Sequence, residues 1–130
     1  MKRILIADDR PNSRELISTA LESFGYEVLE AVDGVDALKV ARTERPDAII
    51  LDIQMPGLDG FGVIRELRAD SSLKLTPVMA LTAGAMETDR NRAIEAGFDS
   101  YISKPVSLPA LRAEVLRLLG MNRAAQPLAD

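Results

Sequence analysis

Residues 48–52 read Ala-Ile-Ile-Leu-Asp, four apolar residues followed by an aspartate. Two other four-residue apolar runs, Ile4–Ala7 and Val78–Leu81, are likewise bounded by polar or turn residues. Short runs of this kind predict strands that are buried on both faces, as in a parallel sheet. Glu27–Ala31 and Ser100–Ser103 are weaker strand candidates. The chain therefore offers five strands for one sheet.

Helical patterns fill the intervals between these strands. Apolar residues recur at the three-to-four-residue spacing of a helix face; they are Leu16, Ile17, Ala20, Leu21 and Phe24, then Leu38 and Ala41, then Ile64 and Leu67, and finally Leu108, Leu111, Val115 and Leu118. Asn12 is expected to cap the first helix, and Gly25 to end it. A helix near Thr88–Ala96 is expected to be loosely held, because only Ala93 and Ile94 offer it an apolar face.

The alternation of strand and helix decides the fold class. Five such units with short connections imply right-handed crossovers and a parallel sheet covered by helices on both faces. We expect a doubly wound α/β domain with the strand order 2-1-3-4-5. This domain is expected to span residues 1–121. Residues 122–130 carry no periodic apolar face and are expected to form a tail or the stump of a linker.

Composition excludes several classes of function. The 130 residues include sixteen Lys plus Arg and twenty Asp plus Glu, a net charge of −4. There is no cysteine and no histidine, which excludes disulfides, thiol chemistry and imidazole ligands or bases. The acidic balance argues against nucleic-acid binding. No unbroken apolar run exceeds four residues, so neither a signal peptide nor a membrane span is expected, and the predicted location is the cytoplasm.

The strand ends carry the chemistry. Asp8 and Asp9 follow the first strand, Asp52 follows the third, Thr82 the fourth and Lys104 the fifth. In open α/β sheets, ligands bind outside the carboxyl ends of the strands, where the strand order reverses. Strands one and three are neighbours at that point, so the three aspartates are expected to converge. Thr82 and Lys104 would lie along the same edge.

Three converging carboxylates need a cation or a proton. Two unit charges 4 Å apart repel by about 4 kcal/mol at an effective dielectric of 20. Three aspartates and one lysine sum to −2, which Mg²⁺, or Mn²⁺ in its place, would neutralise. Each residue alone has an ordinary alternative as a turn, cap, strand or solvated loop residue. Together they are the parts needed to take up a phosphoryl group.

Five segments resemble response-regulator receiver domains of the chemotaxis-regulator type. They are Ile4-Leu-Ile-Ala-Asp-Asp9, Ile50-Leu-Asp-Ile-Gln-Met-Pro-Gly57, Leu81-Thr-Ala83, Ala96-Gly97 and Tyr101-Ile-Ser-Lys-Pro105. The resemblance extends over roughly Lys2 to Gly120 and implies the flavodoxin-like receiver fold. It also implies a role in two-component or phosphorelay signalling. No second core or output motif is recognisable, so we expect either a single-domain response regulator or a receiver domain cut from a longer protein after about Met121.

The resemblance implies a role for each strand-end residue. Asp52 would accept a phosphoryl group from a histidine kinase or a histidine phosphotransfer protein. Asp9 would bind Mg²⁺ directly and Asp8 largely through water, while Asp52 and the backbone carbonyl of Gln54 would complete the metal site.

The remaining implied roles concern the phosphoryl group and the switch. The hydroxyl of Thr82, the backbone N–H of Ala83 and the ammonium of Lys104 would bind phosphoryl oxygens. The Lys104–Pro105 peptide bond would be cis, and Tyr101 would turn inward on activation. Two further residues, Gln54 and Gly84, adjoin the site. A bulky replacement at Gly84 is expected to slow loss of the phosphoryl group. The Gln54 side chain could either block or position the attacking water.

Other classes of protein use similar parts. A phosphatase of the haloacid-dehalogenase type has an Asp-x-Asp motif, whereas Asp52 is followed two residues later by Gln54. A flavodoxin-like carrier would need a hydroxyl-rich phosphate loop after the first strand. We therefore expect a signalling module and not a turnover enzyme, with a phosphate sink or a pseudo-receiver as the alternative.

The output surface is expected to be the face formed by residues 88–119. Its partner would be a protein or a second copy of the chain. Leu116 is expected to be exposed there, within a charged rim formed by Arg90, Arg92, Arg112 and Glu114.

Overall fold

The computed structural model describes residues 1–83 and 87–121, with the backbone only at residues 87–89. Within these ranges strands and helices alternate as β1 (Arg3–Ala7), α1 (Pro11–Ser23), β2 (Glu27–Ala31), α2 (Gly34–Glu44), β3 (Ala48–Asp52), α3 (Gly60–Ala69), β4 (Val78–Thr82), α4 (Glu87–Ala96), β5 (Ser100–Ser103) and α5 (Leu108–Leu119). The tail expected at residues 122–130 lies outside the described residues.

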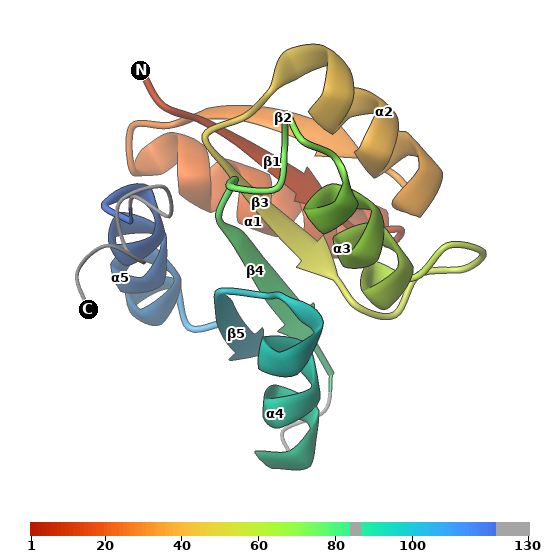
Figure 1. Cartoon of the computed structure of the whole chain (residues 1–130). Helices are drawn as coiled ribbons and strands as arrows, with labels where there is room; N and C mark the ends of the chain where they lie inside the picture. Colours follow the sequence, from red (N-terminus) through yellow and green to blue (C-terminus); the bar gives the residue numbers. More distant parts are fainter. Residues whose placement is uncertain (84–86, 122–130) are drawn as a thin grey trace.

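All strand pairs are parallel, and the sheet has the order β2-β1-β3-β4-β5 (Figure 1). The register pairs Ile4 of β1 with Ala48 of β3, and Ile50 of β3 with Met79 of β4. The predicted fold class is confirmed. β1 and β3 are neighbours, although the chain visits β2 between them, so their carboxyl ends form the switch point of the sheet.

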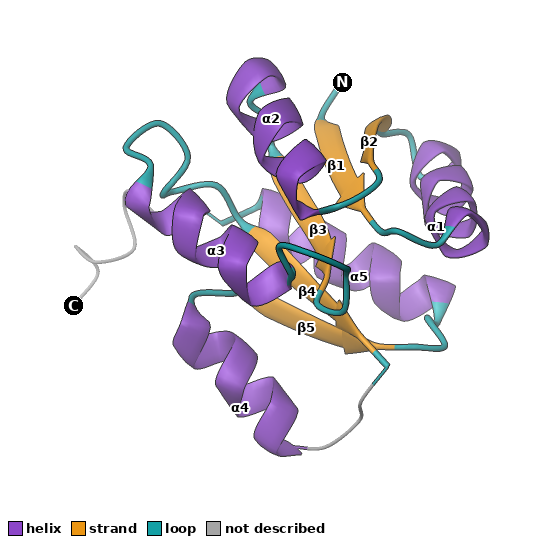
Figure 2. Cartoon of the chain, turned by 90° about the vertical axis from the view of Figure 1, so that its right-hand side faces the viewer, coloured by secondary structure: helices purple, strands orange, loops and turns teal. Residues whose placement is uncertain are grey.

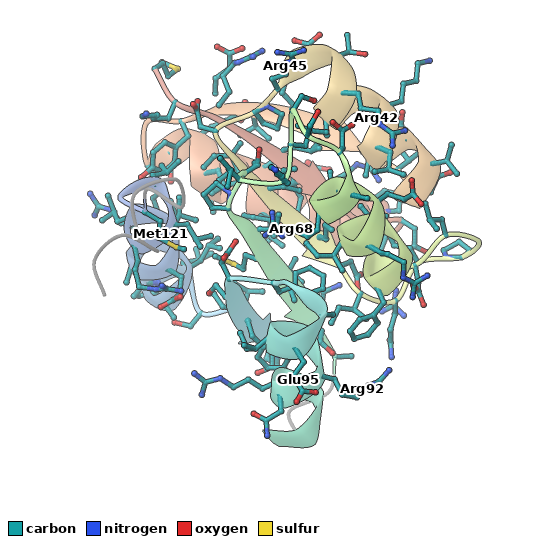
Figure 3. The ribbon with its side chains drawn as sticks, in the orientation of Figure 1. Arg42, Arg45, Arg68, Arg92, Glu95 and Met121 are labelled. Carbon is teal, nitrogen blue, oxygen red and sulfur yellow. The ribbon has the colours of Figure 1, made fainter. Side chains whose placement is uncertain are left out.

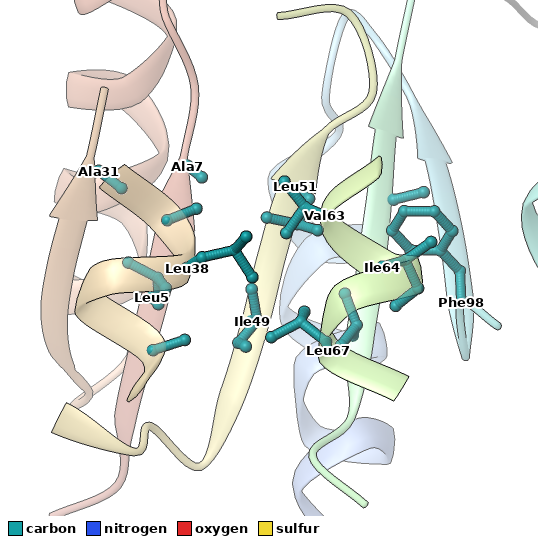
Figure 4. Packing of buried hydrophobic residues seen from close by; sticks show 14 of the residues in the cluster. Leu5, Ala7, Ala31, Leu38, Ile49, Leu51, Val63, Ile64, Leu67 and Phe98 are labelled. Carbon is teal, nitrogen blue, oxygen red and sulfur yellow. The ribbon is translucent and has the colours of Figure 1, made fainter. Parts of the chain in front are cut away.

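Helices cover both faces of the sheet (Figure 2). α1 and α5 pack on one face, where Ile17 and Leu111 contact the core. α2, α3 and α4 pack on the other face. Figure 4 shows α2 and α3 against strand residues such as Leu5, Ile49 and Leu51. Successive strand side chains point to opposite faces, so each central strand contributes to both cores.

Side-chain caps fix where three helices begin. The Asp33 carboxylate accepts a hydrogen bond from the Asp36 amide at α2, and Asp59 accepts one from the Gly62 amide at α3. Ser107 caps α5 in the same way. These bonds satisfy amides that have no partner within the helix.

The cap predicted for the first helix is wrong. α1 begins at Pro11, Arg10 occupies the cap position, and no side chain caps the helix, so Asn12 lies inside its first turn. Proline suits the first helical position because its φ is already helical and it has no N–H to satisfy. The predicted end is correct, since Gly25 follows α1 with a φ of +97°, a conformation that glycine adopts without strain.

Three leucine and isoleucine side chains expected in the core are exposed. Leu16 is 55%, Ile94 47% and Leu108 40% exposed. Consecutive helix residues point about 100° apart, so Ile17 takes the core position beside Leu16, and Ala93 takes it beside Ile94. Leu108 opens α5 and lies on its outer surface. Ala93 is the buried side chain of α4 among those that the structure describes, which agrees with the weak anchoring expected there.

Arg68 ties the amino end of the sheet together. Its guanidinium, which is labelled in Figure 3, donates to the carbonyls of Gly97 and Thr76 and pairs with Asp99 at 2.9 Å. Asp99 also accepts from the Val78 amide. The end of α3, the start of β4 and the turn before β5 are therefore held by one side chain, at the opposite end of the sheet from Asp8, Asp52 and Lys104.

Candidate functional site: an acidic cluster at the carboxyl end of the sheet

Three strands bring charged side chains to one point. Asp8 directly follows β1, Asp52 is the last residue of β3, and Lys104 directly follows β5. Asp8 and Asp52 are buried, with 0% and 4% of their surfaces exposed. Buried charges are stable only when they are paired, protonated or bound to a metal.

Lys104 links the two buried carboxylates. Its Nζ donates to Asp52 Oδ2 at 3.0 Å and to Asp8 Oδ2 at 3.2 Å. The other oxygen of each carboxylate accepts a backbone N–H, from Gln54 at Asp52 and from Arg10 at Asp8, both at 2.9 Å. Each of these two side chains is therefore held at both oxygens.

Asp9 completes an acidic cluster. One carboxylate oxygen from each of Asp8, Asp9 and Asp52 lies within 4.8 Å of the others. Among the described residues, the buried Asp9 Oδ1 has no hydrogen-bond partner. A buried acceptor without a partner is unfavourable, and an all-oxygen set with few protein ligands suits Mg²⁺. The donors present therefore fit a magnesium ion.

The two buried aspartates have opposite pKa shifts. Burial raises the pKa of Asp52, and the charge of Asp8 adds to this; hydrogen bonds from Lys104 and Gln54 only partly oppose it. Burial also acts to raise the pKa of Asp8, but bonds from Ser13, Arg10 and Lys104 outweigh it and lower that pKa. When two like charges share a site, their pKa values move apart in this way.

The carboxylates also act on Lys104. Burial disfavours its charge, but Asp52 and Asp8 outweigh burial and raise the pKa of the ammonium. Lys104 therefore stays a cation beside the two carboxylates. Its peptide bond to Pro105 is cis, as the resemblance implies.

The other predicted site residues that the structure describes lie on β4 and β5 or just after β3 and β4. Thr82 is the buried last residue of β4 and pairs in register with Ser103, while Ala83 is exposed just beyond it. The Gln54 side chain is exposed, and the residue contacts Asp52 through its backbone N–H. Tyr101 is half-buried against the core beneath α2, α3 and α4. Gly84 lies outside the described residues.

Three residues contact Asp8 in ways that the sequence pattern did not predict. The backbone N–H of Arg10 and the hydroxyl of Ser13 bind its carboxylate, and the Arg14 Nη1 donates to its carbonyl oxygen at 2.9 Å. Their sequence signal is a place at the start of the helix after the acidic pair, where a backbone amide such as that of Arg10 is free to bind a carboxylate.

The expected output face is divided by the structure. Glu114 and Arg90 lie in a groove between α4, β5 and α5 that Tyr101 also lines. Arg112 and Leu116 lie elsewhere, in a groove between α5 and α1 in which Arg112 sits over the ring of Phe24. The prediction that they share one rim with Arg90 is therefore wrong. Residues i and i+2 of a helix point about 160° apart, which separates Arg112 from Glu114.

Arg92 also lies apart from Arg90. It projects from α4 (Figure 3) and sits over the ring of Phe61 from α3, so it does not line the groove with Arg90 and Glu114. Glu114 accepts from Ser100 and pairs with Arg117 within α5.

The doubly wound parallel sheet, with an acidic cluster and a lysine at its switch point, is the class of α/β fold and site that the resemblance to receiver domains implies. Residues 4–116 match the response regulator receiver domain family, and the chain belongs to this family. It is thus a receiver domain of two-component signalling. No helix within the described residues is long and apolar enough to cross a membrane.

Curated relatives differ in how much further they extend. The polar-differentiation response regulator DivK of Brucella anthropi is 38% identical over 92% of this chain and 97% of its own length. The probable transcriptional regulator ycf27 of Cyanophora paradoxa is 42% identical over 91% of this chain but 48% of its own length. The chain spans about half the length of ycf27 from this organism and of the ycf27 relatives from Porphyridium aerugineum, Guillardia theta and Galdieria sulphuraria.

Solved structures match closely. The receiver domain of the sensor histidine kinase PA1611 from Pseudomonas aeruginosa, with a magnesium ion coordinated in its active-site cleft, is 36% identical and has a TM-score of 0.86. The match covers 92% of this chain and 98% of that one. The chemotaxis response regulator CheY4 of Vibrio cholerae is 32% identical, with a TM-score of 0.85 over 91% of this chain and 98% of its own.

Proposed function

We propose that this receiver domain is a phosphorylation-dependent switch in which Asp52 accepts a phosphoryl group from a phosphohistidine donor. The observation that carries the proposal is the position of Lys104, whose ammonium bridges Asp52 and Asp8 at the carboxyl end of the central strand. Asp52 is the member of the acidic cluster that terminates this strand.

The transfer needs a carboxylate nucleophile. An oxygen of Asp52 attacks the phosphorus, the new O–P bond forms, and the bond from phosphorus to the donor breaks with its electron pair on the leaving group. That group is an imidazole nitrogen of the donor, which is reprotonated from solvent, or acetate when acetyl phosphate is the donor. The reaction uses up the donor once per event, so the domain takes part in transfer without being a turnover enzyme.

Mg²⁺ would be held by Asp8, Asp9, Asp52 and the carbonyl of Gln54, and it would neutralise charge on the phosphoryl oxygens. The unpartnered Asp9 oxygen and the magnesium ion in the PA1611 receiver domain support this assignment. Lys104 keeps its contact with the Asp52 side and offers a cation to the incoming phosphoryl group.

The same edge offers donors for the product. We assign the hydroxyl of Thr82 and the N–H of Ala83 to phosphoryl oxygens, because Thr82 ends β4, the strand beside Asp52, and Ala83 directly follows it. Phosphorylation adds charge and three acceptor oxygens, and each charge-assisted hydrogen bond contributes about 1.5–3 kcal/mol. Two such bonds suffice to shift an equilibrium that lies a few kcal/mol toward the inactive state.

The signal would leave through the face formed by α4, β5 and the α4 side of α5. Movement of Thr82 would vacate space that Tyr101 fills, and the weakly anchored α4 would respond. The recipients we infer are a histidine kinase or phosphotransfer protein as donor and a downstream protein or second copy as output. We take residues 1–121 as the receiver unit. A phosphate sink without conformational output is the alternative.

Intact-mass analysis tests the proposal. With Mg²⁺ and acetyl phosphate the chain should gain one phosphoryl group, and removal of Mg²⁺ with a chelator should prevent the gain. Asp52→Asn should abolish it while the circular dichroism spectrum stays that of the wild type. Asp59→Asn is the matched control, because Asp59 caps α3 outside the acidic cluster and asparagine also caps helices. Full labelling of Asp52→Asn would refute the assignment.

A further inference from the structure

The Arg14 side chain connects the acidic pair to the edge of the sheet. Its Nη1 donates to the carbonyl oxygen of Asp8 at 2.9 Å, and its Nε pairs with Glu30 Oε1 at 2.9 Å. The side chain is 17% exposed, against 49% for Glu30. Glu30 lies on β2, opposite Ile6 of β1, so the arginine spans from α1 to two strands. Figure 2 shows α1 following β1 through a short loop.

The carbonyl that Arg14 binds belongs to the peptide unit between Asp8 and Asp9. A peptide unit is planar, so holding its oxygen also sets the direction of its N–H and the position of the next Cα. The Asp8 amide is already fixed by the carbonyl of Ala31 at 3.2 Å. With both ends of Asp8 bound, the Cα of Asp9 is placed by the bond from Arg14.

Asp9 is the residue of the cluster with the fewest restraints of its own. Asp8 and Asp52 are held by Lys104 and by backbone amides, whereas the buried Asp9 Oδ1 has no partner among the described residues. The position of the Asp9 carboxylate therefore depends mainly on the backbone of Asp9. That backbone is held by the hydrogen bond from Arg14 to the Asp8 carbonyl oxygen.

We infer that Arg14 is a positioning residue that, oriented by Glu30, holds the Asp8–Asp9 peptide so that the Asp9 carboxylate faces a bound divalent cation. This inference rests on the proposed magnesium site. Residues that orient metal ligands typically contribute 10–100-fold to affinity. The contribution of Arg14 is geometric, because its charge is offset by that of Glu30.

The sign of the effect separates positioning from electrostatics. Removing a cation near a cation site strengthens metal binding if charge alone acts. Removing a positioning residue weakens it. Arg14→Ala should weaken Mg²⁺ binding about 10-fold in isothermal titration with MgCl₂. Arg14→Lys keeps the charge but cannot make two bonds in the same fixed geometry, and it should also bind Mg²⁺ several-fold more weakly.

Arg3→Ala is the matched control. Arg3 also pairs with a glutamate, Glu44, at 2.9 Å and donates to a main-chain carbonyl, but it stands at the opposite end of β1. The two alanine variants change the net charge equally and each leaves one glutamate unpaired. Arg3→Ala should bind Mg²⁺ as tightly as the wild type.

A second readout needs no metal. Without Mg²⁺, hydrogen exchange at the Asp9 amide should be faster in Arg14→Lys than in the wild type, since the peptide loses its restraint. If the wild type fails to bind Mg²⁺, the proposed function fails. If the wild type binds Mg²⁺ and both Arg14 variants match it or bind more tightly, the positioning role alone is overturned; should Arg14→Ala not fold, Arg14→Lys decides.

Discussion

At the scale of single residues, Asp8, Asp9 and Asp52 show how identical side chains acquire different chemistry. Asp8 is fully buried and has its pKa lowered by hydrogen bonds, whereas burial keeps the pKa of Asp52 raised. Asp9 has an open acceptor instead. The three aspartates differ in pKa shift and in hydrogen-bond partners because each lies at a different position at the strand ends.

Ser100 and Glu114 give a pH-dependent prediction at the same scale. The Ser100 hydroxyl donates to Glu114 Oε1 at 2.5 Å and is the largest cause that lowers the pKa of Glu114 from its ordinary 4.5; Arg117 lowers it further, against partial burial. The stabilisation that the ionised Glu114 gives to the folded state is present above its ordinary pKa. It is lost as the pH falls through the lower pKa that Glu114 has in the folded state.

Ser100→Ala should therefore reduce the free energy of unfolding by about 1 kcal/mol at neutral pH, a modest value because the Glu114 side chain is 34% exposed. Urea denaturation should show this difference shrinking as the pH is lowered below 4.5. Glu114→Gln is the control for the pH dependence. The glutamine amide oxygen still accepts a hydrogen bond from Ser100, but the glutamine side chain does not titrate. An undiminished difference in acid would contradict the assignment.

The sequence could predict which polar residues lie at the strand ends, because each buried apolar run ends at the first polar residue that follows it. It could not predict the contacts of Arg14, since they depend on how α1 leaves the turn after β1. That geometry is set by a proline start and not by the Asn12 cap that the pattern indicated.

At the scale of elements, glycines allow the loop between β3 and α3 to pack closely on its neighbours. A Cβ built on Gly34, the first residue of α2, would lie 2.0 Å from the Leu58 carbonyl oxygen. A Cβ on Gly62 of α3 would instead meet the Leu58 Cδ1 at 2.4 Å, the end of a flexible side chain. The first clash involves backbone and the second does not.

Gly34→Ala should therefore destabilise the domain by about 3 kcal/mol, because the loop carrying Leu58 must move. Gly62→Ala is the matched control and should change stability by less than about 1 kcal/mol, since the Leu58 side chain can rotate and alanine favours a helix. Thermal unfolding measures both. Equal destabilisation by the two variants would show that side-chain and backbone clashes cost the same here.

Helix periodicity reliably predicts the central stripe of buried residues on a helix. It is less reliable for residues at the margin of that stripe. Ile17, Leu21, Val115 and Leu118 are buried as expected, whereas Leu16 and Ile94 are not. A margin residue is decided by the neighbouring helix, which a local pattern does not contain. The separation of Arg112 from the α4 side of the domain has the same origin.

At the scale of the whole molecule, the two ends of the sheet are held differently. Arg68 fixes the amino end through α3, β4 and the turn at Gly97. The carboxyl end is held by charges around Lys104 that a phosphoryl group would rearrange. α4 is tied to the amino end at its last turn, and Ala93 is its buried side chain among those that the structure describes, which favours α4 as the element that would respond.

Hydrogen exchange with Mg²⁺ and beryllofluoride, a mimic of the phosphoryl group, tests whether this arrangement switches. Exchange should change in α4, and it should slow in β5 as Tyr101 packs into the space beside Thr82, whereas the Arg68-bound turn at Thr76 should stay as it is. Asp52→Asn with the same additives is the control and should show no change. A response confined to the loops that carry Asp9 and Asp52 would identify a phosphate sink, because the added charge would then be absorbed locally without moving α4.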